Sequence, residues 1–140
     1  MTASLNLMKL CVGCDDPAEL GAWQKHRFGG GPARHVTRMW PKRMAELLDG
    51  GSIYWVFKGV MQARQRILDL HEVQGEDGIR RCALMLDPTL VRVAAVPRRP
   101  FQGWRYLPGS EAPPDLPAGR GDEPSLPPEI ARALAEMGLR

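Results

Sequence analysis

Long hydrophobic runs are missing from this sequence of 140 residues. No apolar stretch approaches the roughly 20 residues that a membrane-spanning helix needs, so we expect no membrane partner. The N-terminus also lacks the basic and then apolar layout of a secretory signal. The cytoplasm is therefore the expected location.

Cysteine and histidine are scarce as well, with three of each. Cys11 and Cys14 form a Cys-x-x-Cys, a spacing that can hold a metal ion or a redox disulfide. A structural zinc needs about four ligands, and the sequence has no second Cys-x-x-Cys and no paired-histidine motif. Cys82 and the separated histidines can complete a site only through the fold. We expect inert thiols, no metal and no cofactor, with metal and redox roles as alternatives.

Catalytic motifs are also few. There is no Gly-x-Ser-x-Gly elbow and no evident pair of catalytic carboxylates. The glycines at 29–31 precede no Gly-Lys-Ser/Thr, which favours a flexible connection over a phosphate-binding loop. The alternative that remains open is a small hydrolase-like enzyme with a pocket near Thr37, Lys42 and Ser52.

Basic residues, in contrast, are concentrated in the middle of the chain. Residues 34–105 carry 13 basic and 7 acidic side chains, whereas residues 106–140 carry 3 basic and 6 acidic ones. A basic body followed by an acidic tail is compatible with a polyanionic partner, or with a tail that folds over the basic surface.

The first 28 residues predict a strand and a helix. The apolar stretch 5–12 predicts a strand. Asp16 is then a helix N-cap, followed by proline at the first helical position and by the acidic Glu19. The helix is expected to run to about residue 27 and to bury Leu20 and Trp23.

The stretch from 35 to 57 predicts a strand, a short helix and a second strand. Residues 35–40 have strand character, and Pro41 suits the first turn of a helix. Gly50 supplies the left-handed residue that ends this helix. Residues 52–57 are strong β formers. The core-facing residues expected of the helix are Met44, Leu47 and Leu48.

Strands joined by tight turns dominate the next part. A long strand is expected over 60–73, with a bulge around 65–68 where the alternation slips. The turn at 75–78 leads to strands over 79–86 and 90–96. Short turns between strands, with helices early in the chain, indicate an α+β domain around a mostly antiparallel, strongly bent sheet.

The C-terminal third predicts less regular structure. Prolines make 97–106 an extended arm. We divide the chain into a domain over 1–107, a proline- and glycine-rich acidic linker over 108–126 and a helix over 127–140. The apolar stripe of that helix is expected to dock on the body or on a second copy of the chain, which would form a homodimer.

Arginines and lysines alternate with aromatic residues through the basic middle. Arginine binds phosphates through two parallel hydrogen bonds, and aromatic rings stack on unpaired bases. The same aromatic residues would, as an alternative, form the core. The candidate nucleic-acid-binding residues are Arg38, Lys42, Arg43, Lys58, Arg64, Arg66, Arg98, Arg99, Trp104 and Arg105.

Three stretches, 37–43, 47–56 and 100–106, resemble a family of conserved bacterial proteins of unknown function, across roughly residues 5–107. More distantly, a helix ending in Leu-x-x-Gly before a β barrel resembles the PUA-like superfamily, including its ASCH branch. That resemblance implies a small, partly open β barrel with flanking helices, often used on RNA. ASCH domains carry Gly-x-Lys-x-x-Glu-x-Arg, and this sequence has Ser52, Trp55 and Phe57 at the three charged positions, so ASCH hydrolase chemistry is not implied. We expect an α+β, PUA-like barrel that binds nucleic acid, with RNA as the preferred partner.

Overall fold

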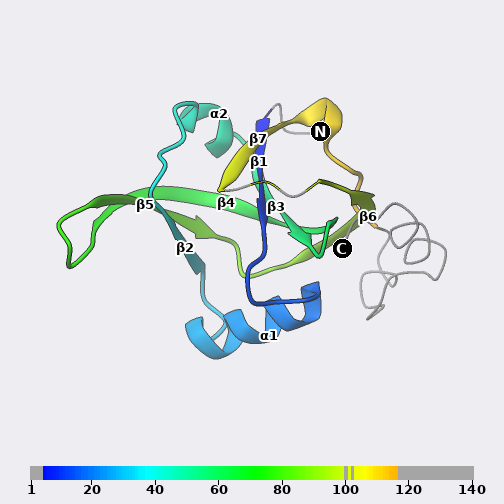
Figure 1. The fold of residues 1–140 in the computed structure, drawn as a ribbon, viewed down its shortest axis with the longest axis horizontal. Coiled ribbons are helices and arrows are strands. Elements are labelled where there is room, and N and C mark those ends of the chain that lie inside the picture. Colours follow the sequence, from blue (N-terminus) through cyan, green and yellow to red (C-terminus); the bar gives the residue numbers. More distant parts are fainter. Residues whose placement is uncertain (1–4, 100, 102, 117–140) are drawn as a thin grey trace.

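Two half-sheets that share one long strand, β4 (Val60–Gln74), form the body of the structure (Figure 1). The computed structural model describes residues 5–99, 101 and 103–116. Its seven strands follow the order β2-β5-β4-β3-β1-β7, with β6 paired to β4. All pairs are antiparallel except β1 with β3. The other strands are β1 (Leu5–Leu10), β2 (Ala33–Thr37), β3 (Ser52–Phe57), β5 (Arg80–Leu86), β6 (Val91–Pro97) and β7 (Trp104–Pro108). The expected α+β fold with a mostly antiparallel sheet is confirmed.

Strand β4 passes from one half-sheet to the other at a bulge. Its first part, 60–64, pairs with β6, and its second part, 67–74, pairs with β5 along the same edge. The register with β5 shifts between Ile67 and Asp69, which overlaps the bulge expected at 65–68. Bulges bend a strand and increase its twist, and this lets one strand serve two sheets. Among the described pairings, β2 joins only β5 and β7 joins only β1, so these strands end the path. We call the side where β2 faces β1 and β7 the seam.

Helix α1 (Pro17–Phe28) begins as the sequence predicts. The Asp16 carboxylate accepts a hydrogen bond of 2.9 Å from the Glu19 N–H, and Gly29 ends the helix with φ at 65°. The expected burial of Trp23 is wrong, since Trp23 is 51% exposed. Leu20 and Gln24 are buried instead. Successive helical residues are about 100° apart, so a stripe that passes through 20 and 24 leaves 23 to one side.

Helix α2 (Met44–Leu48) is short and buries Leu47 completely, whereas Leu48, also expected in the core, is 36% exposed. Gly50 has φ at 81°, as a residue that ends a helix through the left-handed region should. The preceding strand, expected over 35–40, ends at Thr37 because the chain then crosses the seam toward β7.

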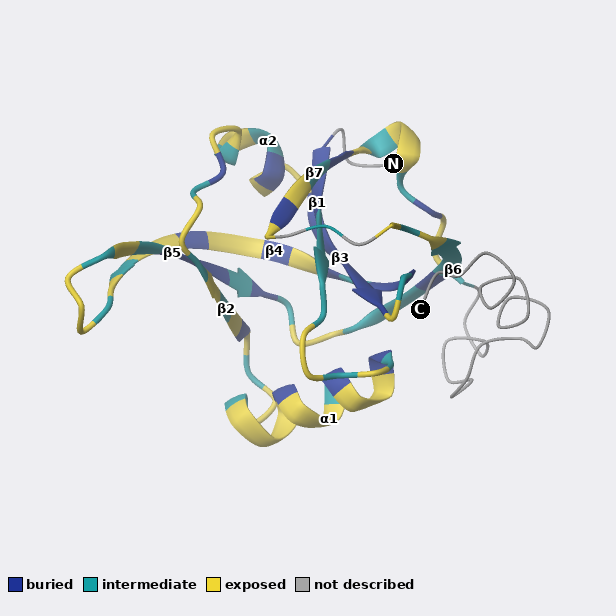
Figure 2. Ribbon diagram, in the orientation of Figure 1, coloured by how far each residue is buried: buried dark blue, intermediate teal, exposed yellow. Residues whose placement is uncertain are grey.

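The core has two parts, one on each face of the half-sheet that contains β3. All six residues of β3 are buried (Figure 2). Because neighbouring residues of a strand point to opposite faces, Trp55 and Phe57 enter the main core between the half-sheets, whereas Tyr54 and Val56 enter a smaller one. A strand buried on both faces accounts for the unbroken hydrophobic run.

The prediction of an extended arm in the C-terminal part is wrong for its last residues. The arm expected over 97–106 includes strand β7, whose residues Trp104–Pro108 pair with β1. The chain then forms a short 3₁₀ helix (Gly109–Glu111) and runs along β6, where the Ala94 N–H donates to the Pro114 carbonyl at 2.8 Å. We call residues 109–116 the strap. The tail helix predicted over 127–140 lies outside the described residues. Within the described part, no helix is long and apolar enough to cross a membrane.

Candidate nucleic-acid interface

A cavity of about 310 Å³ opens at the seam, and we call it the seam pocket. Its lining combines the end of β1 and the following loop with side chains from α1, β2 and β3. The lining is mostly apolar and includes Leu20, Trp23, Trp55 and Leu86. A cavity of this size and character is typical of a small-molecule or base-binding site.

Aromatic rings form two sides of the seam pocket. The His35 and Trp55 rings meet edge to face, with centroids 5.4 Å apart and planes at 88°. At the mouth, the exposed Trp23 ring contacts Phe28 edge to face at 5.9 Å. Edge-to-face contacts hold rings in a defined orientation. The pocket therefore has a fixed inner ring and an outer ring open to solvent.

Two cations, Lys9 from β1 and Arg34 from β2, line the same pocket. Burial and then the positive charge of Lys9 lower the pKa of His35, and the same charge partly offsets the burial that raises the pKa of Cys11. Each of these effects requires that the ammonium group lie close to the titrating atoms. Arg34 is exposed, so its guanidinium remains accessible to an anion.

His35 is a neutral imidazole inside the pocket wall. Burial, followed by the charge of Lys9, lowers the pKa of His35 to about 4. Its Nε2 atom is buried and has no hydrogen-bond partner among the described residues. An unsatisfied buried polar atom costs about 1–3 kcal/mol. A ligand in the seam pocket that offered a donor or an acceptor to Nε2 would recover this cost.

The two cysteines of the Cys-x-x-Cys also line the pocket. Cys11 follows β1 directly, and its N–H donates to the Val56 carbonyl at 2.8 Å. Burial, with a smaller effect from Cys14, raises the pKa of the Cys11 thiol to about 12. Reactive cysteines have lowered pKa values, so this thiol is not an activated nucleophile at neutral pH. The described residues contain no group of three or more His, Cys, Asp or Glu side chains placed to hold a metal ion.

A buried amide network sets the position of Trp55 at the back of the pocket. The Trp55 Nε1–H donates to the Gln65 Oε1 at 2.9 Å. Gln65 and Gln24 donate to one another at 2.6 and 2.9 Å, and Gln65 also donates to the Asp87 carbonyl at 3.0 Å. The network uses both donors and both acceptor sites of the Gln65 amide. The sequence offers no signal for this contact, because a lone glutamine usually lies at the surface.

At its other end the seam is closed by the chain between β2 and α2. The Trp104 Nε1–H donates to the Met39 carbonyl at 2.9 Å. The Tyr106 hydroxyl accepts from the N–H groups of Lys42 and Arg43 at 2.7 and 3.1 Å. The predicted ligands Arg38, Lys42 and Arg43 are therefore exposed beside the seam. Trp104 is 6% exposed, so its ring packs in the core and is not presented for stacking.

The other sequence-predicted residues lie elsewhere. Arg64 and Arg66 pair with Tyr54 and Ser52 in register, so they point away from the seam, on the opposite face of the half-sheet. Arg105 points to that face too, and its guanidinium lies 5.5 Å from the Phe101 ring centroid.

A third group is at the β3–β4 turn, where the Arg98 N–H donates to the Gly59 carbonyl at 2.8 Å. Arg99 follows in the chain, and Lys58 forms an ion pair of 3.3 Å with Asp15. The structure thus divides the nine predicted cations among three regions and places Trp104 in the core. Of the alternative enzyme residues, Ser52 lines a second cavity on the face away from the seam. Neither Thr37 nor Lys42 lines that cavity or the seam pocket.

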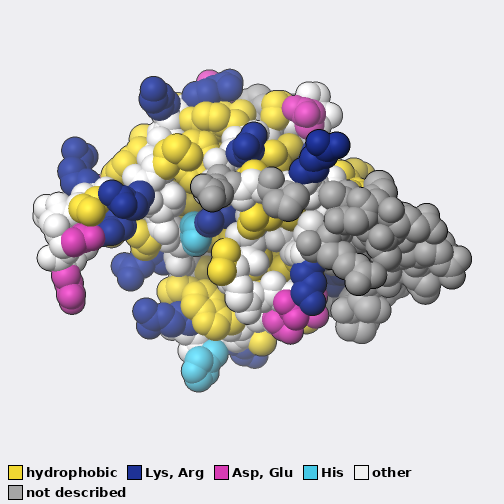
Figure 3. Space-filling model, in the orientation of Figure 1, with side chains coloured by type: hydrophobic (Ala, Val, Ile, Leu, Met, Phe, Trp, Pro, Cys, Tyr) yellow, Lys and Arg dark blue, Asp and Glu magenta, His cyan; other side chains and the backbone are white. Residues whose placement is uncertain are grey.

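Positive side chains are more widespread than acidic ones on one broad face of the body, among many hydrophobic side chains. Figure 3 shows lysine and arginine side chains spread over this face, while acidic side chains gather toward its edges. An ion pair such as that of Glu46 with Arg43 takes up one charge of each sign, so pairing leaves the excess of positive side chains unchanged. The remaining field around the body favours an anionic partner.

Comparison with known proteins assigns the chain to a family. The model of the family described as protein of unknown function DUF1489 matches residues 7–140. The chain belongs to this family. No curated protein and no solved structure matches the chain. The seam pocket therefore stands on its geometry alone as a candidate site of a family member.

Proposed function

We propose that this protein binds nucleic acid, preferably single-stranded RNA, with one unpaired base in the seam pocket. The observation that supports this most is the combination of an aromatic, apolar cavity with two cations, Lys9 and Arg34, among its lining residues. Sequence-specific RNA recognition usually takes an unstacked base onto aromatic side chains and binds the adjoining phosphates with arginine or lysine.

The inner part of the pocket suits the edge of a base. The neutral His35 ring offers a nitrogen without a described partner beside the apolar Trp55 ring. A protonated histidine would repel the cations nearby, whereas the neutral ring forms an uncharged hydrogen bond. Trp23, exposed at the mouth, supplies a ring face on which the same or the next base can stack.

The proposed path of the bound RNA follows the seam. Beyond the pocket, the exposed Arg38 and Lys42 continue the positive surface toward β7, next to Arg43, whose guanidinium is paired with Glu46. Phosphates bound there would leave the base next to the pocket free to turn inward. A partly open barrel of the PUA-like kind, often used on RNA, is the architecture that the sequence resemblance implies, and we retain it as an analogy.

The hydrolase alternative has less support. The raised pKa of Cys11 keeps its thiol protonated, and the Ser52 hydroxyl contacts Arg64, a hydrogen-bond donor that cannot accept the hydroxyl proton. Nucleophilic catalysis needs the opposite arrangement, with a base that removes the proton.

The test is a binding titration with a fluorescein-labelled, mixed-sequence single-stranded RNA and the duplex of the same sequence, read by fluorescence anisotropy. We expect the single strand to bind more tightly, because its bases can enter the pocket without unpairing. The logarithm of the affinity should fall linearly with the logarithm of the salt concentration, by about 0.7 per neutralised phosphate. Failure to bind either RNA at low salt would disprove the proposal.

A further inference from the structure

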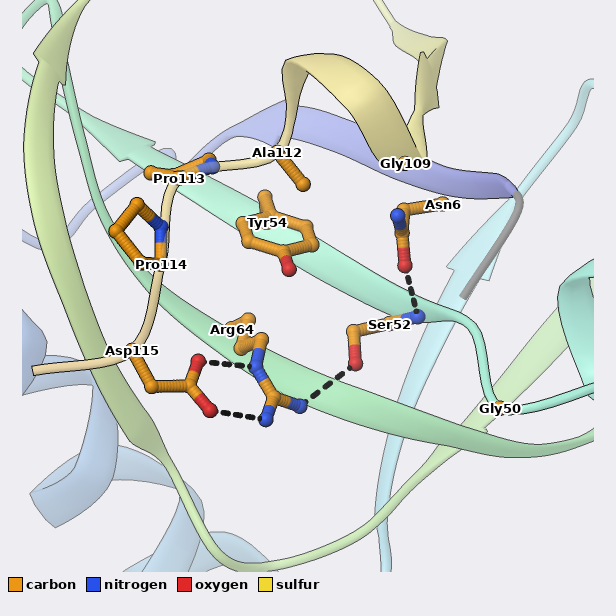
Figure 4. Close-up of a pocket in the computed structure, with 10 residues that line it drawn as sticks. All are labelled: Asn6, Gly50, Ser52, Tyr54, Arg64, Gly109, Ala112, Pro113, Pro114 and Asp115. Carbon is orange, nitrogen blue, oxygen red and sulfur yellow. Dashed lines mark hydrogen bonds and ion pairs between the residues drawn. The ribbon is translucent and has the colours of Figure 1, made fainter. Parts of the chain in front are cut away.

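A second cavity, of about 260 Å³, lies on the opposite face of β3, under the strap (Figure 4). We call it the strap pocket. Its floor consists of four polar side chains, Asn6, Ser52, Tyr54 and Arg64, and strap residues from Gly109 to Asp115 form its roof. It shares no lining residue with the seam pocket. An inference about it is therefore independent of the proposed function.

Among the described residues, Arg64 is the one cation that lines the strap pocket, and it is held by the strap itself. Its Nε and Nη2 atoms each donate to one carboxylate oxygen of Asp115, both at 2.7 Å, and Nη1 donates to the Ser52 Oγ at 3.0 Å. This two-pronged arrangement is the one by which arginine also binds phosphate.

The other groups of the floor have hydrogen-bond donors to spare. Asn6 accepts from the Ser52 N–H at 2.9 Å, and its own amide nitrogen is 3.5 Å from the Leu107 carbonyl. The Ser52 oxygen already accepts from Arg64, so its hydroxyl proton is free to donate elsewhere. Figure 4 shows the Tyr54 hydroxyl pointing into the same space, and burial raises the pKa of Tyr54, which keeps this group a donor.

Within the described part of the chain, the one acid that lines this pocket is Asp115, which belongs to the strap and not to the floor. Asp115 has a side chain 44% exposed, and that of Arg64 is 24% exposed. Partly exposed ion pairs contribute little net stability, so an external anion can compete for the guanidinium. The strap backbone is anchored separately, by hydrogen bonds of 2.8 and 2.9 Å to β6. The Asp115 side chain can therefore leave Arg64 without the strap detaching.

We propose that the strap pocket is a binding site for a phosphate group, and that the Asp115 carboxylate occupies the place of this group in the absence of ligand. Arg64 receives two phosphate oxygens, and the Ser52 and Tyr54 hydroxyls donate to the others. The strap thus carries a built-in competitor. The affinity of the wild-type protein for phosphate is lowered by the work of displacing it.

The experiment titrates inorganic phosphate into the full chain and measures the affinity from the backbone ¹⁵N–H signals of Ser52 and Tyr54, with the Arg64 Nε–H signal as a second probe in the variants that keep Arg64. Asp115→Asn keeps the size of the side chain and removes its charge, and Asp115→Ala removes the competitor entirely. Both should bind phosphate at least about tenfold more tightly than wild type. Glu111→Gln removes an exposed strap charge outside the pocket and should leave the affinity unchanged. Arg64→Gln combined with Asp115→Asn should abolish the gain.

Acetate provides the second arm, because it reproduces the planar carboxylate of Asp115 without the tetrahedral phosphate. Preference for phosphate over acetate in Asp115→Asn supports the assignment, and equal or tighter acetate binding overturns it. Thermal unfolding of each variant in buffer free of both anions checks that the fold is kept. If Asp115→Asn is folded and binds phosphate no better than wild type or the double variant, the tethered-competitor proposal is wrong.

Discussion

Gln24 in α1 and Gln65 in β4 hold one another through two reciprocal amide hydrogen bonds of 2.9 and 2.6 Å. Gln65 is completely buried at the bend of β4, and Gln24 is 8% exposed. The pair fixes α1 against the sheet, and the further bond from Trp55 fixes the back wall of the seam pocket. One glutamine thus connects the helix, the bend and the candidate site.

Replacing this glutamine should therefore be costly. Gln65→Leu keeps the volume but leaves the Gln24 amide, the Trp55 Nε1–H and the Asp87 carbonyl without their partner. At about 1–3 kcal/mol per unsatisfied buried group, we expect a loss of 3 kcal/mol or more in the free energy of unfolding. Urea denaturation measures it. Gln74→Leu, at an exposed position of the same strand, should change stability by less than about 0.5 kcal/mol.

Gly51 lies where a side chain has no room. A Cβ atom there would be 2.4 Å from the Leu47 carbonyl oxygen and 2.7 Å from that of Leu5, and both are backbone atoms that cannot rotate away. Gly51→Ala should lower the free energy of unfolding by about 1–3 kcal/mol, as measured by thermal or urea unfolding. Gly21→Ala is the matched control, because a Cβ at this helical position meets nothing within 4 Å. It should stabilise the protein by about 0.5–1 kcal/mol, and similar effects of the two substitutions would contradict the packing at Gly51.

The lowered pKa of His35 predicts a pH dependence. Its pKa falls from 6.5 to about 4 on folding, so between these values the unfolded chain binds a proton that the native state does not. The free energy of unfolding is therefore not reduced by His35 above pH 6.5. As the pH falls toward 4, protonation of His35 in the unfolded chain lowers this free energy by up to about 3 kcal/mol. Urea unfolding across this range should show a smaller loss in His35→Gln than in wild type. The exposed His26→Gln should follow wild type, and identical slopes for all three proteins would rule out a buried neutral His35.

Local sequence signals predicted the elements that depend on near neighbours. Asp16 caps α1 and Gly50 follows α2 because capping involves residues within one turn. The failures involve distant partners. Trp23 was expected in the core, yet Gln24 takes the inward position because Gln65, far along the chain, satisfies its amide. Strand β7 was expected as an arm, and pairing with β1 brings it into the sheet at an edge.

The candidate site was predictable only in its chemistry. The sequence indicates cations near aromatic residues. Which of these side chains share a face of the sheet depends on how neighbouring strands pair, and the sequence alone does not give that register. Arg64 and Arg66 fall on the face away from the seam because they pair with Tyr54 and Ser52. Arg34 belongs to the basic stretch that the sequence singles out, although it is not one of the ten candidate ligands. Lys9 gave no signal, because it is a single charged residue in a short strand. The fold brings them together at the seam pocket.

The separation of cations between two faces gives the most direct prediction for the proposed function. Arg34→Gln and Lys9→Gln each remove a positive charge from the seam pocket, and each should weaken RNA binding and reduce the salt slope by about 0.7. Trp23→Ala should also weaken binding, by about 1–3 kcal/mol, but leave the salt slope unchanged because it removes stacking and no charge. Fluorescence anisotropy at several salt concentrations measures both quantities.

Arg66→Gln is the matched control, because it removes the same charge from an exposed residue on the opposite face of the half-sheet. The net charge of this variant equals that of Arg34→Gln, so a partner attracted only by overall charge would be weakened equally by both. If the RNA occupies the seam, Arg34→Gln should weaken binding more than Arg66→Gln does. Charges are screened over about 8–10 Å at physiological salt, so a charge on the far face has little effect on the seam. Equal losses for Arg34→Gln and Arg66→Gln, with no loss for Trp23→Ala, would mean that the seam pocket does not receive a base. Binding would then be a property of the whole charged surface.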